Sequence, residues 1–91
     1  MDDRALLKYL EELVDRLGIL IRHERFESEN DFSAGGLCRI KGRQVLILNR
    51  GASMHEKVRA LRRALVKFDL GGLYIKPALR DFLESEERDP Y

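Results

Sequence analysis

The residues of this chain with the most recognisable chemistry are His55 and Glu56, which begin like the zinc-peptidase motif H-E-x-x-H. In that motif two histidines four residues apart bind one metal ion, and the glutamate activates a water molecule. The fourth residue after His55 is Arg59, whose permanent positive charge cannot bind zinc and repels it. We therefore predict that His55 is a surface histidine beside a helix cap.

The remaining soft or imidazole ligands are Cys38 and His23, and nothing in their spacing from His55 predicts a shared site. A lone cysteine in an apolar stretch is typical of a small buried side chain on a strand. No other pattern supplies a nucleophile beside a base, a metal cluster or a phosphate-binding loop. The sequence therefore predicts a protein that is not an enzyme, with no catalytic residue, metal, cofactor or small-molecule substrate.

The charged residues are distributed unevenly, although the net charge of the chain is only +1. Residues 1–38 carry a net charge of −4 and residues 68–91 a net charge of −3, whereas residues 39–67 carry nine basic side chains against one acidic and reach +8. We predict that seven of these basic residues form an anion-binding or partner-binding surface. They are Arg39, Lys41, Arg43, Arg59, Arg62, Arg63 and Lys67.

The last four of these residues are linked by three- and four-residue steps, so they share much of one helix side and repel one another by a few tenths of a kcal/mol per pair. Two sources could offset that repulsion. One is the acidic residues of the first and third helices, and the other is a nucleic acid. No aromatic residue is interleaved with the basic ones for base stacking, which favours the internal explanation.

Apolar periodicity places the elements that carry these residues. Steps of three and four residues predict helices at about 3–17, 54–68 and 77–86. The second begins with Ser53 and Glu56, which match the capping box. Alternation predicts a strand over 19–26, and two apolar arms around Lys41-Gly42 predict a β-hairpin over 36–49.

These elements predict an α+β fold in which a small antiparallel sheet of about three strands packs with three helices. The second arm of the hairpin is apolar on both faces, so we expect it to be the central strand and to be covered on each side. The polar stretch 27–33 is expected to be a loop. Residues 85–91 are expected to be a frayed acidic tail.

Length and composition restrict the class of protein further. Ninety-one residues allow one domain, predicted here as 1–91. A single cysteine excludes an intramolecular disulfide and favours a reducing compartment, which we expect to be the cytoplasm. No apolar run approaches the roughly 20 residues that span a bilayer, and the acidic start is unlike a signal peptide, so no membrane partner is expected.

The stretch 36–49, which reads GLCRIKGRQVLILN, followed by a capped helix, resembles the hairpin and active-site helix of ImmA/IrrE-type zinc metallopeptidase domains. Those domains enter the hairpin through glycine, turn through glycine, and end the second strand in an I-x-L-N-like sequence. Their next helix carries H-E-x-x-H. Here that helix has no histidine after His55, so no catalytic residue is carried over. The resemblance implies a metal-free remnant of such a domain.

The function predicted from these observations is protein–protein contact by a small non-enzymatic or structural domain, with a protein partner or self-association as a homodimer. The alternative is a nucleic-acid-binding module that uses the basic hairpin and helix over 39–67.

Overall fold

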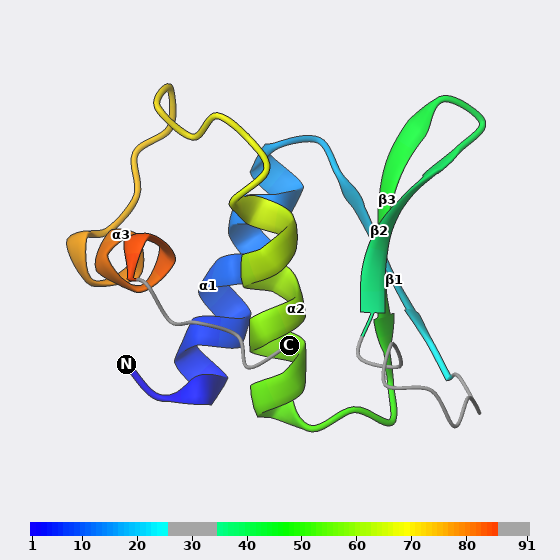
Figure 1. Ribbon diagram of the computed structural model, residues 1–91, viewed down its shortest axis with the longest axis horizontal. Helices are drawn as coiled ribbons and strands as arrows, with labels where there is room; N and C mark the ends of the chain where they lie inside the picture. The colour runs from blue at the N-terminus through cyan, green and yellow to red at the C-terminus, as the bar shows by residue number, and fades with distance from the viewer. Residues whose placement is uncertain (26–34, 86–91) are drawn as a thin grey trace.

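The helices and strands follow the predicted order. The computed structural model describes residues 1–25 and 35–85. Its elements are α1 (Asp3–Arg16), β1 (Leu20–Glu24), β2 (Gly35–Ile40), β3 (Arg43–Asn49), α2 (Met54–Leu65) and α3 (Pro77–Glu84) (Figure 1). The α+β class is confirmed, and the three helices end one to three residues earlier than the sequence predicted. The predicted loop 27–33 lies outside the described residues, as does the predicted tail from residue 86 on.

Both long helices begin where a side chain satisfies an exposed backbone amide. The Asp2 carboxylate accepts a hydrogen bond of 2.9 Å from the amide of Ala5, at the start of α1. At the start of α2 the Ser53 hydroxyl accepts from the Glu56 amide (3.1 Å), and the Glu56 carboxylate accepts from the Ser53 amide (2.8 Å). The predicted capping box is therefore confirmed.

The sheet has the strand order β1-β3-β2, so β3 is the central strand as predicted. β2 and β3 pair antiparallel through the predicted hairpin, but β1 pairs parallel to β3 and the sheet is mixed rather than fully antiparallel. The register explains this difference. Glu24 ends β1 opposite Asn49, and Gly35 begins β2 opposite Leu48, so β1 ends where β2 begins. β2 then runs back against β1, and β3 returns from the hairpin in the direction of β1.

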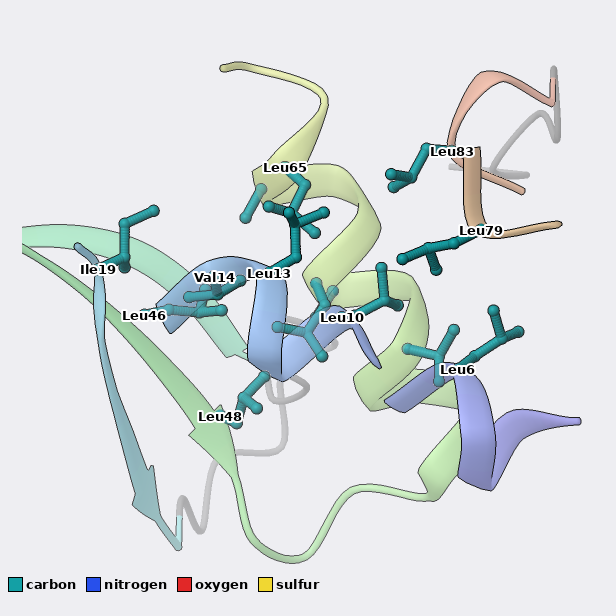
Figure 2. Close-up of a cluster of buried hydrophobic side chains, with 14 of the residues drawn as sticks. Leu6, Leu10, Leu13, Val14, Ile19, Leu46, Leu48, Leu65, Leu79 and Leu83 are labelled. Atoms are coloured by element: carbon teal, nitrogen blue, oxygen red, sulfur yellow. The ribbon is translucent and has the colours of Figure 1, made fainter. Parts of the chain in front are cut away.

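The three helices all lie on one side of the sheet (Figure 1). α1 and α2 run side by side against the sheet, and α3 lies on their far side. Figure 2 shows Leu46 and Leu48 of β3 directed towards Leu10 and Leu13 of α1, with Leu79 and Leu83 of α3 on the opposite side of the helix pair. All six side chains are buried in one apolar cluster.

Of the helices within residues 1–25 and 35–85, none has the length and apolar character needed to cross a membrane.

Candidate interaction surfaces

The structure divides the seven predicted basic residues between two places. Arg39, Lys41 and Arg43 belong to the β2–β3 hairpin, and the other four lie on α2 or just after its end. Lys41 and Gly42 form the turn, with backbone φ angles of 51° and 82°. Positive φ at both positions is the geometry of a two-residue type I′ turn, which follows the twist of the flanking strands. The turn therefore presents three exposed cations at one tip, which we call the hairpin tip.

Arg62 is directed towards α3 and away from the sheet. Its Nε donates a hydrogen bond of 3.2 Å to the carbonyl of Phe82, and its Nη2 donates to the carbonyl of Ser85. The guanidinium also lies 5.8 Å from the centre of the Phe82 ring, within the range of a cation–π contact. Backbone carbonyls at the end of α3 thus bind Arg62, where the sequence had suggested acidic side chains of the flanking helices. Arg62 consequently joins α2 to α3.

Arg63 and Lys67 lie on the other flank of the exposed side of α2. Together with β2 they line an open groove of about 330 Å³. The lining residues in this groove are Gly35, Gly36, Leu37, Ala60, Arg63, Ala64, Val66 and Lys67. Arg59, nearer the start of α2, is half-buried. The predicted basic surface is therefore two separate features, the hairpin tip and this groove, and Arg59 and Arg62 belong to neither.

One face of the sheet has no helix of the described residues against it. Side chains that pair directly across strands share a face, so Leu20 and Cys38 flank Val45 on the face opposite Leu46. Leu20 is 46% exposed and Ile40 is 37% exposed, whereas Val45 between the strands is only 3% exposed. We call this surface the open face and define it by Leu20, Cys38, Ile40, Val45 and Ile47.

The open face was not among the predicted sites, and the sequence did contain a signal for it. β3 is apolar at consecutive positions, which indicated a strand covered on both sides. The structure supplies a helical layer for Leu46 and Leu48, and none of its described helices lies over Val45 and Ile47. Within residues 1–25 and 35–85 no helix supplies the expected second cover, and the exposed large apolar side chains on this face are Leu20 and Ile40.

A pair of opposite charges lies on β1 at the edge of the open face. Arg22 and Glu24 alternate with Ile21 and His23 along the strand, so they project on the same side as Leu20. Their Nη2 and Oε2 atoms are 2.6 Å apart. An apolar surface with both signs of charge at its rim has the composition of a protein–protein contact.

The structure does not bring the candidate metal ligands together. His55 lies at the start of α2, where its Nδ1 is 3.3 Å from Oδ2 of Asp3. Cys38 is half-buried on the open face, and His23 lies on the opposite side of its strand. Among the described residues no group of three or more histidine, cysteine or acidic side chains has a metal-binding arrangement.

Comparison of the chain with protein-family models, with curated protein sequences and with solved structures found no match. The hairpin tip, the groove and the open face, with the chemistry of their side chains, are therefore the features from which a function is inferred.

Proposed function

We propose that this chain is a non-enzymatic protein-interaction domain that self-associates through its open face. The observation that supports the proposal is the exposure of Leu20 and Ile40 on a sheet face over which no described helix lies. Burial of apolar surface gives about 25 cal/mol for each Å² removed from water, so contact with a second apolar surface is favourable there. The ImmA/IrrE-like hairpin is consistent with this proposal as the remnant of a domain that has lost its zinc-binding histidines.

Charge complementarity favours a second copy of the chain as the occupant. Arg22 and Glu24 lie two residues apart on the same face, so a two-fold axis can place Arg22 of one copy against Glu24 of the other. The surface is then self-complementary, as a symmetric dimer requires. A net charge of +1 also produces little overall repulsion between two copies.

The size of the open face predicts how tightly two copies associate. Strands about 4.8 Å apart with about 3.3 Å per residue give a three-stranded face of only a few hundred Å². Stable complexes bury about 800 Å² on each partner. We therefore expect a weak dimer that forms with increasing protein concentration.

Sedimentation velocity over a range of concentrations tests this proposal. We expect the weight-average mass of the wild-type chain to rise towards that of a dimer, and Leu20→Ser to remain monomeric. Tyr74→Ser is the matched control, because Tyr74 is 74% exposed but lies outside the sheet. A wild-type chain that stays monomeric at every concentration, or a Leu20→Ser variant that dimerises normally, would contradict the proposal.

Nucleic-acid binding is a second candidate function, and the exposed hairpin tip is the observation that favours it. Each phosphate that Arg39, Lys41 or Arg43 neutralises releases counterions, so binding has to weaken steeply with salt. Because Arg62 is engaged with α3, fewer cations are available than the charge count implied. Fluorescence anisotropy with labelled DNA and RNA at about 50 mM salt tests this candidate. No binding there would exclude it.

A further inference from the structure

We propose that the outer edge of β2 and the groove beside it bind an extended acidic peptide of a partner protein, which adds to the sheet as a fourth strand. This inference rests on the chain being a protein-interaction domain. It concerns a different surface from the open face and does not depend on self-association.

The edge of β2 supplies backbone groups for such a strand. β2 is at one end of the strand order, so only its β3 side is paired within the described sheet. Ile40 and Arg43 flank the two-residue turn and form a hydrogen-bonded pair, and such pairs alternate along an antiparallel ladder. The amides and carbonyls of Leu37 and Arg39 therefore point away from β3. An added peptide strand can pair with them, the mode of binding called β-augmentation.

The groove supplies a place for alternate side chains of that strand. A strand that pairs with β2 lies about 4.8 Å from it and directs every second side chain towards α2. The groove at that position is lined by the small residues Ala60 and Ala64 of α2 and by Leu37 of β2. Val66 beside them is 53% exposed. The volume of the groove, about 330 Å³, is at the lower end of the range of about 300–1,000 Å³ for ligand sites, which suits a few short side chains.

The charge of the lining determines the chemistry of the peptide. Lys67 lines the groove, and no aspartate or glutamate of the described residues does so. Arg39 adds a second cation on the adjoining strand. A peptide that combines aliphatic with acidic side chains matches both the apolar floor and this basic rim, and complementary charge raises both specificity and association rate.

Nuclear magnetic resonance titration of the full chain with a synthetic peptide tests the inference. The probe is a capped peptide of sequence Val-Glu-Glu-Val-Val-Glu-Glu-Val, in which both faces of the extended strand carry both residue types. The matched control has lysine in place of glutamate. We expect saturable shifts of the Leu37 and Arg39 amides with the acidic peptide only. Equal binding of the lysine peptide, or shifts confined to Lys41 and Arg43 or to the open face, would overturn the inference.

Two variants separate backbone pairing from charge. Arg39→Pro removes the outward-pointing amide at a position on an edge strand, where proline is tolerated, and Arg39→Ala removes only the side chain. Arg39→Pro should bind the acidic peptide at least about tenfold more weakly than Arg39→Ala, the effect of losing about 1.4 kcal/mol. Lys67→Glu should weaken binding by a similar factor. Circular dichroism establishes that each variant is folded, and a folded Arg39→Pro variant that binds like Arg39→Ala would count against strand addition.

Other occupants of the same edge give different results. Pairing of β2 with β2 of a second copy would appear as a dimer that Leu20→Ser leaves intact, and it would contradict a peptide partner. Backbone contacts between β2 and residues 86–91 in the free chain would show that the acidic end of the chain is the occupant instead. If the wild-type chain is monomeric and still binds the acidic peptide, self-association is wrong while the present inference holds.

Discussion

At the scale of single residues, Arg62 was predicted to belong to a charged surface, but its side chain joins two helices. It is half-buried, and it contacts two carbonyls and an aromatic ring at the end of α3. Carbonyls at a helix C-terminus carry partial negative charge, so a guanidinium is favourable there. This contact also offsets part of the repulsion among the basic residues of α2, because the two carbonyls stabilise the positive charge of Arg62.

Replacement of Arg62 should therefore reduce stability. Hydrogen bonds to charged groups are worth about 1.5–3 kcal/mol, so we expect Arg62→Ala to lower the free energy of unfolding by about 2 kcal/mol. Amide exchange in α3 should also become faster. Urea denaturation of Lys67→Ala is the control, since loss of an exposed cation near the same helix should change stability by no more than about 0.5 kcal/mol. Equal effects of the two substitutions would mean that Arg62 does not hold α3.

Glu56 gives a pH-dependent prediction at the same scale. Hydrogen bonds with Ser53 hold the pKa of Glu56 below the ordinary value of 4.5. The hydrogen bond that the Ser53 backbone amide donates has the largest effect. A lowered folded-state pKa stabilises the protein above pH 4.5, and that stabilisation is lost as the pH falls through the lowered value. Urea denaturation should therefore show Glu56→Gln to be less stable than wild type at neutral pH and equal to it in acid.

Ser53→Ala is the comparison for that experiment. It removes the hydroxyl that accepts from the Glu56 amide and leaves the backbone amide that donates to the carboxylate. Its cost of about 1 kcal/mol should therefore persist in acid. A Glu56→Gln deficit that is the same at both pH values would exclude the carboxylate charge as the cause.

At the scale of the elements, the entry into β2 depends on the absence of a side chain at Gly35. Its φ of +138° is a conformation that other residues rarely adopt. A Cβ atom there would lie 2.3 Å from the carbonyl oxygen of Ile47 and 3.0 Å from the Cα of Leu48. Close approach of β2 to β3 at this point therefore requires glycine, whereas Gly36 has nothing within 4 Å of the corresponding position.

The two glycines form a matched pair for mutation. We expect Gly35→Ala to cost about 1–3 kcal/mol or more, because it adds a clash to an unfavourable backbone conformation. Gly36→Ala should leave stability unchanged within about 1 kcal/mol, since its backbone φ is not in the left-handed range. Urea denaturation measures both, and a tolerated Gly35→Ala would mean that β2 begins differently from the register described above.

At the scale of the whole molecule, the layers explain where contact surfaces remain. α1 and α2 have the sheet on one side and α3 on the other, so these two sides of the helix pair pack against other elements of the same chain. Among residues 1–25 and 35–85, the helices lie on one face of the sheet and β2 has a strand on one edge. The two proposed interaction sites are these unused face and edge.

The charge segments also acquire a different meaning at this scale. The basic stretch 39–67 folds into the end of β2, into β3 and into α2. Its basic side chains lie on different parts of the surface, so the charge of +8 does not form one patch. Arg62 is directed to α3, Arg63 and Lys67 to the groove, and the hairpin cations to the tip. A negatively charged partner would therefore contact only some of the basic side chains that make up the charge of +8.

The sequence by itself determined the positions of the helices, the capping box at Ser53 and Glu56, the hairpin turn at Lys41 and Gly42, and the central place of β3. These features depend on residues within a few positions of one another, or on the apolar content of a single strand. Tertiary structure alone decided that β1 joins parallel to β3, that Arg62 binds a carbonyl 23 positions later, and that none of the described helices covers one face of the sheet. Those outcomes depend on which distant segments share the core, and local pattern carries no information about that choice.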